Sequence, residues 1–123
     1  MNVLLDTHIV LWWLNDDSKL IDTHKEIITN TDNLCYVSAV TIWEISIKSK
    51  LGKLKISNNY IDELKKEGFL ELQISWIHSN QVTKLPPIHT DPFDRLLIAQ
   101  TQIEKLILLT VDDYIKKYEV KIL

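Results

Sequence analysis

Short apolar runs alternate with helical patterns along the chain, and this alternation is the feature that most restricts the fold. Such runs are typical of buried or edge strands. Strands that alternate with helices favour parallel pairing through helical crossover connections. We therefore expect an α/β sandwich with a mainly parallel sheet of about five strands. The predicted strands are Asn2–Leu5, Leu34–Val37, Phe69–Ile74, Leu106–Leu109 and Val120–Leu123.

Length and composition indicate a single domain over residues 1–123. No apolar run approaches the roughly 20 residues needed to span a bilayer. The apolar start ends at Asp6 and no basic region precedes it, so we expect no signal peptide and a cytoplasmic protein. The single Cys35 excludes an internal disulfide. A net charge of −3 argues against binding nucleic acid by overall charge alone, but a nuclease that gathers carboxylates around a divalent cation remains possible.

The segment Pro86–Gln102 contains the most strongly patterned helix. Asp91 precedes Pro92, and proline is favoured in the first helical turn, so Asp91 is predicted to cap a helix that starts near Phe93. Helical spacing then puts Asp94 on the inward face. Two explanations for this carboxylate stay open. It could bind free N–H groups of the first turn, or it could be a metal ligand.

Three further acids fall at comparable places. Asp6 follows the first predicted strand and Asp112 the fourth, and sites in parallel α/β folds lie at the carboxyl ends of strands. Glu44 lies in the middle of a helix predicted over residues 38–51, within an apolar stripe that consists of Val40, Trp43, Ile47 and Leu51.

The four acids have two explanations. They could converge at one end of the sheet, or Asp6, Asp94 and Asp112 could be separate helix caps.

Glu44 is the hardest of these acids to explain as a structural residue. An unpaired buried carboxylate costs several kcal/mol, so a cation should lie nearby. Lys48 and Lys50 are expected at the edge of the stripe or beyond it, so a bound divalent ion would fit. Carboxylates without Cys or clustered His suit Mg²⁺ or Mn²⁺, and such an ion is suited to phosphodiester hydrolysis by water.

Four blocks of the sequence together resemble a known family. In chain order they are VLLDTHIVLWWL, SAVTIWEISIKSKLGKL, LPPIHTDPFDRLLIAQ and LLTVDDYIKKY. They are similar to the PIN-domain ribonucleases, and most closely to the VapC-type toxins of bacterial toxin–antitoxin pairs. The resemblance implies a three-layer α/β/α sandwich, a Mg²⁺- or Mn²⁺-dependent endoribonuclease that cleaves RNA, a homodimer, and inhibition by a cognate antitoxin protein.

The resemblance also implies which residues form the site. Its catalytic set is Asp6, Glu44, Asp94 and Asp112. Asp6 and Asp94 would be the principal metal ligands, and Glu44 and Asp112 would complete the site directly or through water. Asp113 competes with Asp112 and yields to it by motif position only. The chain departs from the family pattern where the turn before Leu106–Leu109 lacks the usual glycine.

Two basic residues are candidates for contact with RNA. Lys48, just beyond Glu44, and Arg95, next to Asp94, are candidates for holding RNA phosphates, although a solvated helix face is the simpler explanation for the lysine. The tryptophans could stack on bases, but they fit better as core or antitoxin-contact residues. The histidines share no ligand spacing and are interpreted as structural. They are His8, His24, His78 and His89.

Two other functions stay open from the residues. One is a receiver-like, Mg²⁺-binding phosphoacceptor module, although such modules usually have two acids after the first strand, where this chain has Asp6 followed by Thr7 and His8. The other is a catalytically inactive PIN domain that binds RNA or protein.

Overall fold

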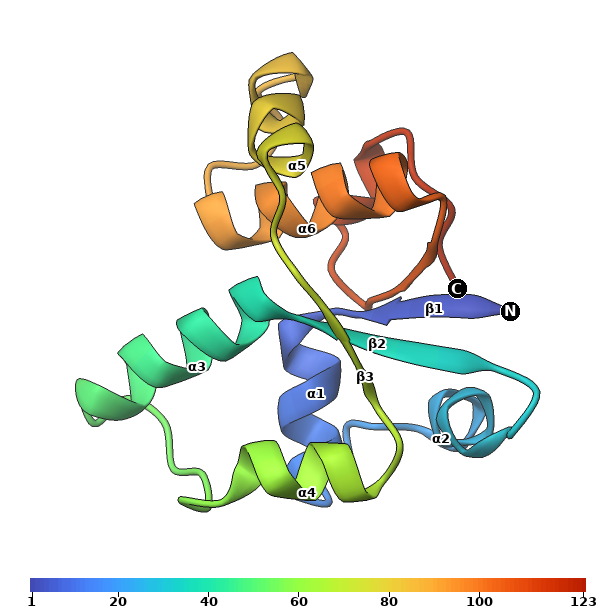
Figure 1. The fold of residues 1–123 in the computed structure, drawn as a ribbon, viewed down its shortest axis with the longest axis vertical. Helices are drawn as coiled ribbons and strands as arrows, with labels where there is room; N and C mark the ends of the chain where they lie inside the picture. The colour runs from blue at the N-terminus through green and yellow to red at the C-terminus, as the bar shows by residue number, and fades with distance from the viewer.

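A parallel sheet lies between two groups of helices in the computed structural model, which describes residues 1–123 (Figure 1). The sheet has four strands in the order β3-β2-β1-β4, and every adjacent pair is parallel. This arrangement confirms the predicted α/β sandwich. The strands are β1 Asn2–Leu5, β2 Leu34–Ser38, β3 Leu70–Leu72 and β4 Ile107–Leu109.

Six α-helices and two 3₁₀ turns connect the strands. None of the helices is long and apolar enough to cross a membrane. The helices are α1 Thr7–Leu14, α2 Asp22–Thr29, α3 Ala39–Lys50, α4 Tyr60–Lys66, α5 Trp76–Gln81 and α6 Pro92–Glu104. The 3₁₀ turns are Val82–Lys84 and Ile115–Lys117.

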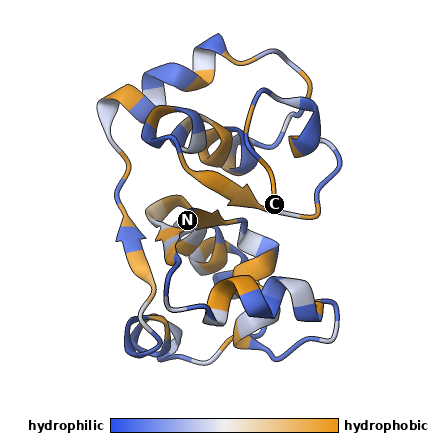
Figure 2. Cartoon of the chain, turned by 90° about the vertical axis from the view of Figure 1, so that its right-hand side faces the viewer, coloured by the Kyte–Doolittle hydropathy of each residue, from blue (hydrophilic) through white to orange (hydrophobic).

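The two faces of the sheet bury separate hydrophobic cores. Side chains alternate along a strand, so Val3 and Leu5 of β1 face one core and Leu4 faces the other. The first core includes residues of α1, α3 and α4, and the second is built mainly on α6 and the C-terminal segment. Hydrophobic strand ribbons accordingly lie between the helical layers (Figure 2).

The predicted fifth strand, Val120–Leu123, does not form. Val120 N–H donates to Tyr118 O, so the chain is still turning there. Only the last residues run beside β4, where Ile122 forms an isolated bridge with Leu108. The expected fifth strand is therefore a single bridge at the edge of the sheet.

The predicted apolar stripe of α3 is right for Val40 and for the inward position of Glu44, but wrong for Trp43 and Leu51. The buried residues of α3 are Val40, Thr41, Glu44 and Ile45. Trp43 and Leu51 are instead 58% and 62% exposed. The reason is tertiary, since the C-terminal end of α3 extends away from the sheet (Figure 1). Trp43, nearer the start of the helix, makes an edge-on contact with Phe93 of α6, with ring centroids 5.2 Å apart, and is otherwise open to solvent.

Candidate functional site

The carboxyl ends of β1 and β4 bring two of the predicted acids to the same edge of the sheet. Leu5 pairs with Leu109, so Asp6 and Thr110 leave the sheet side by side. Thr110 Oγ1 donates to Asp6 Oδ2 at 2.6 Å and accepts from Asp112 N at 3.1 Å. A single hydroxyl thus links the segments that carry Asp6 and Asp112.

The start of α6 brings in Asp94. Asp91 caps this helix as predicted, because its Oδ1 accepts from Phe93 N at 2.8 Å and from Asp94 N at 3.2 Å. Asp94 is buried on the same helix face as Leu97 and Ile98. The cap is Asp91, and the side chain of Asp94 is left to face the other acids.

Glu44 enters the site from α3 and has a partner that the sequence analysis missed. Glu44 is 3% exposed, and Lys48 Nζ lies 2.6 Å from its Oε2. The expectation that Lys48 lies too far round the helix to pair with Glu44 is therefore wrong, because i and i+4 residues lie on the same side of a helix. Lys48 Nζ thus already has a carboxylate partner. Its hydrogen bond to Glu44 raises the pKa of the Lys48 ammonium group.

The acids interact electrostatically as one group. Burial, and after it the negative charges of its neighbours, raise the pKa of Asp94 to about 8. Burial also raises the pKa of Asp6, although the hydrogen bond from Thr110 opposes this shift. The acids whose charges raise the pKa of Asp94 are Asp6, Asp91, Glu44 and Asp112.

Two carboxylate oxygens in this group are buried and have no hydrogen-bond partner. They are Asp6 Oδ1 and Glu44 Oε1. Buried carboxylate oxygens without a partner are costly, and oxygen-rich sites of this kind match the preferences of Mg²⁺ and Mn²⁺. The residues present therefore fit a divalent cation, which would pair with the oxygens that the protein leaves unpartnered.

Asp112, rather than Asp113, faces the site. Asp112 Oδ1 accepts from Tyr114 N at 2.7 Å and from Ile115 N at 3.3 Å, so it caps the turn Ile115–Lys117. The other oxygen, Oδ2, points toward Asp94 and His89. The Asp113 side chain is 93% exposed. The choice made on motif position alone agrees with this geometry.

His89 belongs to the site and was interpreted only as structural. Its Nε2 lies 2.9 Å from Asp94 Oδ2 and 3.6 Å from Asp112 Oδ2. One ligand atom from each of these three residues lies within 4.8 Å of the others. The position of His89, two residues before the capping Asp91, could have indicated that it lies near Asp94. The spacing between the histidines carries no such signal.

Arg95 does not face the acids, contrary to the expectation that it would hold an RNA phosphate. Its guanidinium donates to the carbonyl oxygens of Val82 and Pro86 at 3.1 and 3.0 Å, and to Tyr118 Oη at 3.2 Å. Longer contacts join it to the carbonyls of Leu85 and His89, both at 3.4 Å. Arg95 therefore holds the loop that leads into α6.

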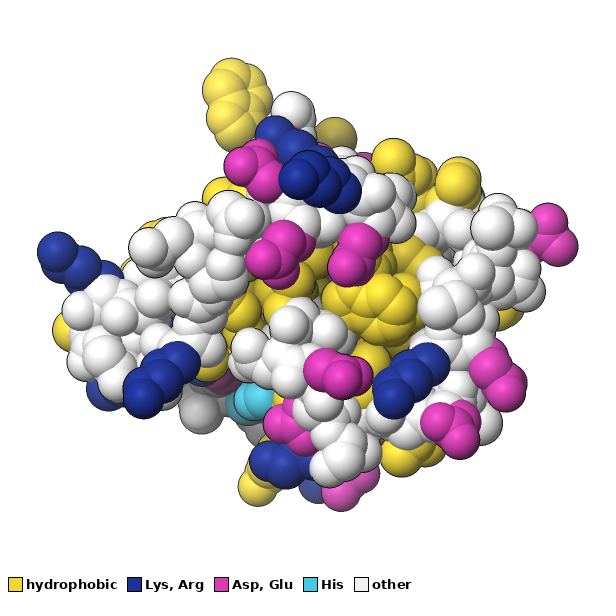
Figure 3. All heavy atoms as spheres, turned by 90° about the horizontal axis from the view of Figure 1, so that it is seen from below, with side chains coloured by type: hydrophobic (Ala, Val, Ile, Leu, Met, Phe, Trp, Pro, Cys, Tyr) yellow, Lys and Arg dark blue, Asp and Glu magenta, His cyan; other side chains and the backbone are white.

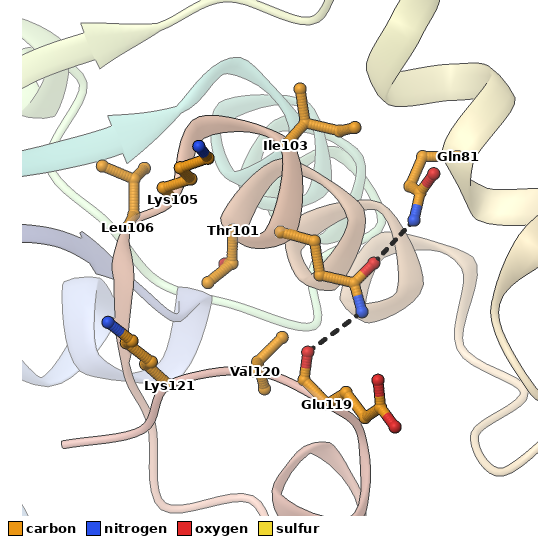
Figure 4. Close-up of a pocket in the computed structure, with 9 residues that line it drawn as sticks. Gln81, Thr101, Ile103, Lys105, Leu106, Glu119, Val120 and Lys121 are labelled. Carbon is orange, nitrogen blue, oxygen red and sulfur yellow. Dashed lines mark hydrogen bonds between the residues drawn. The ribbon is translucent and has the colours of Figure 1, made fainter.

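A polar cavity of about 550 Å³ lies away from the acids (Figure 4). It is lined by α6 from Thr101 onward, whereas Asp94 lies in the first turn of that helix, roughly 10 Å from Thr101 along the axis at 1.5 Å per residue. Gln102 bridges its two sides, accepting from Gln81 Nε2 at 2.9 Å and donating to Glu119 O at 3.1 Å. This cavity contains none of the predicted site residues.

The comparisons with known proteins agree with the fold. The model of the PIN domain family matches residues 3–121. The chain belongs to the PIN domain family. The predicted family resemblance is thereby confirmed over nearly the whole chain. No curated protein sequence matches this PIN domain.

Solved structures show the same fold at low sequence identity. VapBC2 from Rickettsia felis, bound to a DNA fragment from its promoter, has a TM-score of 0.74 at 15% identity, covering 100% of this chain and 98% of that one. DNA-bound VapBC from Salmonella typhimurium has a TM-score of 0.71 at 12% identity, covering 100% and 97%. VapBC-1 from nontypeable Haemophilus influenzae has a TM-score of 0.67 at 17% identity, covering 100% and 97%. The three-layer α/β/α arrangement of this PIN domain is therefore established.

Proposed function

We propose that this PIN domain is a divalent-metal-dependent endoribonuclease and the VapC-type toxin of a toxin–antitoxin pair. The observation that carries the proposal is the meeting of four acids, with two unpartnered buried oxygens, at the carboxyl edge of a PIN-domain sheet. Asp6 and Asp94 would be the principal ligands of Mg²⁺ or Mn²⁺, and Glu44 and Asp112 would complete the site directly or through water. A bound cation would supply a polarised water and positive charge opposite a phosphodiester.

The chain's own residues prepare this site. Thr110 orients Asp6 through its 2.6 Å hydrogen bond, which leaves the other oxygen of Asp6 free. Lys48 offsets one negative charge through Glu44 Oε2 and likewise leaves Oε1 free. The four acids are thus held with an oxygen surplus that a cation, rather than a further protein group, would balance.

Cleavage of RNA by the purified chain tests the nuclease proposal. We expect cleavage with Mg²⁺ or Mn²⁺, loss of cleavage in EDTA, and loss of at least about 100-fold in rate for Asp6→Asn and Asp94→Asn. Asp113→Asn is the matched control, because it removes a neighbouring charge whose side chain is 93% exposed. If either of the first two variants cut RNA as fast as wild type, the site assignment would be wrong. A folded wild-type chain that cuts no RNA would support the inactive PIN domain instead.

Membership in the PIN domain family weighs against the receiver-like alternative. The chain also has Thr7 and His8 where a receiver usually has a second acid. We therefore propose no phosphoacceptor function for this chain.

An antitoxin partner is proposed for two reasons. Similar solved structures are VapBC proteins, two of them bound to DNA. The chain also has a mainly apolar groove of about 290 Å³ between α3, α4 and β3, where Ile42, Ile61 and Phe69 are among the lining residues. The side of the molecule on which α4 lies presents apolar side chains bordered by acidic and basic ones (Figure 3). A helix or extended segment of an antitoxin would fit such a surface.

Co-expression with a small protein found in an open reading frame beside the gene for this chain tests the antitoxin proposal. We expect that protein to relieve growth arrest and to inhibit RNA cleavage by the wild-type chain. Ile61→Asp should keep cleavage and escape inhibition, because Ile61 lies in the groove and is 41% exposed. Light scattering of the free chain tests the homodimer that the family resemblance implies. A chain that is inhibited equally with and without Ile61→Asp would place the antitoxin elsewhere.

A further inference from the structure

His89 joins two acids that come from separate parts of the chain. Asp94 lies in the first turn of α6, and Asp112 lies in the loop after β4. His89 Nε2 is 2.9 Å from Asp94 Oδ2 and 3.6 Å from Asp112 Oδ2. No other side chain is within ion-pair distance of both acids.

The backbone identifies which ring nitrogen carries the proton. Asp91 N–H donates to His89 Nδ1 at 3.3 Å, so Nδ1 is an acceptor and holds no proton. A neutral imidazole then has its proton on Nε2, which faces the two carboxylates. His89 is therefore a hydrogen-bond donor to the acids, and Nε2 is not available as a metal ligand in this tautomer.

The position of His89 is fixed on several sides. Its backbone N–H donates to Tyr118 Oη at 2.7 Å, and its carbonyl accepts from Arg95 Nη1 at 3.4 Å. Its ring lies 5.3 Å from the ring of Tyr114. A donor held in this way costs little further ordering when it orients the acids.

We propose that His89 is a positioning residue, which donates from Nε2 to Asp94 and Asp112 and holds both carboxylates in the orientation that lets them share a divalent cation. The contact uses Oδ2 of Asp94 and leaves Oδ1 available. This inference rests on the proposed metal-dependent function. It differs from that function in naming a hydrogen-bond donor, rather than another ligand, as a requirement of the site.

Mn²⁺ binding, measured from the electron paramagnetic resonance signal of free Mn²⁺, tests the role without depending on activity. We expect His89→Leu to weaken Mn²⁺ binding about 10- to 100-fold, as removal of hydrogen bonds to metal ligands commonly does. His89→Gln should restore most of the affinity, because its amide N–H can take the place of Nε2–H. His24→Gln is the control, since His24 lies on α2, which carries none of the site residues. Thermal unfolding of each variant shows that it folds.

The outcomes separate this inference from the proposed function. If His89→Leu bound Mn²⁺ as wild type does, the positioning role would be overturned while the metal site stood. If wild-type protein with Mn²⁺ gave the pulsed-resonance signature of a directly coordinated nitrogen, His89 would be a ligand and the donor role would be wrong. If wild type bound no Mn²⁺, the proposed function would fail together with the inference. The nitrogen signature is read on wild type, so it decides even if His89→Leu does not fold.

Discussion

Thr110 shows how one hydroxyl can prepare a carboxylate at the residue scale. It donates to Asp6 Oδ2 and accepts from Asp112 N, so it uses both its proton and its oxygen inside the site. Asp6 then keeps one satisfied and one unpartnered oxygen. This asymmetry gives Asp6 a fixed orientation and an open coordination position.

Replacing Thr110 by Val should therefore destabilise the metal-free protein. The substitution keeps the shape of the side chain and leaves a second oxygen of Asp6 buried without a donor, at a cost of about 1–3 kcal/mol. Urea unfolding in EDTA measures the change. Thr110→Ser keeps the hydroxyl and should stay closer to wild type, and a Thr110→Val protein as stable as wild type would show that the hydrogen bond to Asp6 contributes little.

Asp94 makes stability depend on pH in the opposite direction from an ordinary paired carboxylate. Its pKa is raised from 3.8 to about 8 in the folded chain. Between these values the folded state holds a proton that the unfolded state has released, so the unfolding free energy of the metal-free protein falls as pH rises from about 4 to about 8 and then levels off. The raised pKa of Asp6 makes the unfolding free energy change with pH in the same direction.

Asp94→Asn should therefore be more stable than wild type at pH 8 in EDTA, with a smaller loss of stability between pH 5 and 8. Urea unfolding at several pH values measures both effects. Asp113→Asn, at a side chain 93% exposed, should keep the wild-type slope. A wild-type protein that became more stable between pH 5 and 8 would contradict the raised pKa of Asp94.

At the scale of elements, the two ends of α6 decide where Asp94 points and how the chain turns from α6 into β4. Asp91 starts α6 and leaves Asp94 facing inward. At the other end, Lys105 follows α6 in the left-handed conformation, with φ of 54°. Glycine is the usual residue there, because a side chain makes this conformation unfavourable.

Lys105→Gly should stabilise the protein by about 1 kcal/mol, since it removes the cost of a left-handed residue that carries a side chain. Lys105→Ala is the matched control. It removes the charge but keeps Cβ, and should change stability little. Denaturant unfolding of the two variants decides the matter, and a Lys105→Gly protein no more stable than Lys105→Ala would contradict the strain at this position.

At the scale of the whole molecule, the buried acids destabilise the metal-free fold, and the two hydrophobic cores must offset this. The cores lie on opposite faces of one sheet and include Leu4 on one side and Val3 and Leu5 on the other. Asp6 follows these residues directly, so the buried strand places a charge where water is excluded. Folding is thus linked to whatever neutralises the acids.

Mg²⁺ or Mn²⁺ should therefore stabilise the whole domain. A ligand that binds only the folded chain adds about 2.7 kcal/mol when its concentration is 100 times its dissociation constant. Thermal unfolding with increasing Mn²⁺ measures this gain, which should be greater at pH 8 than at pH 6 because the acids must lose their protons to bind metal. Asp6→Asn should lose the gain, whereas an equal Mn²⁺ effect in that variant would point to binding elsewhere.

The sequence by itself determined the features that depend on neighbours along the chain. Short apolar runs, and alternation in Phe69–Ile74, located all four strands of the sheet. The Asp91–Pro92 pair located the start of α6, because capping is also local. The pairing of Glu44 with Lys48 is also local, at i and i+4, and could have been predicted.

Only the tertiary structure decided which side chains other elements bury, and which residues distant in sequence come into contact. Val120–Leu123 had strand composition but reached β4 at one bridge, and Trp43 and Leu51 had helical spacing but stay mostly exposed. His89 gained its role from Asp112, which is distant in sequence and close in space. Spacing cannot report such contacts, because strand order and loop packing set them, and these are properties of the whole folded chain.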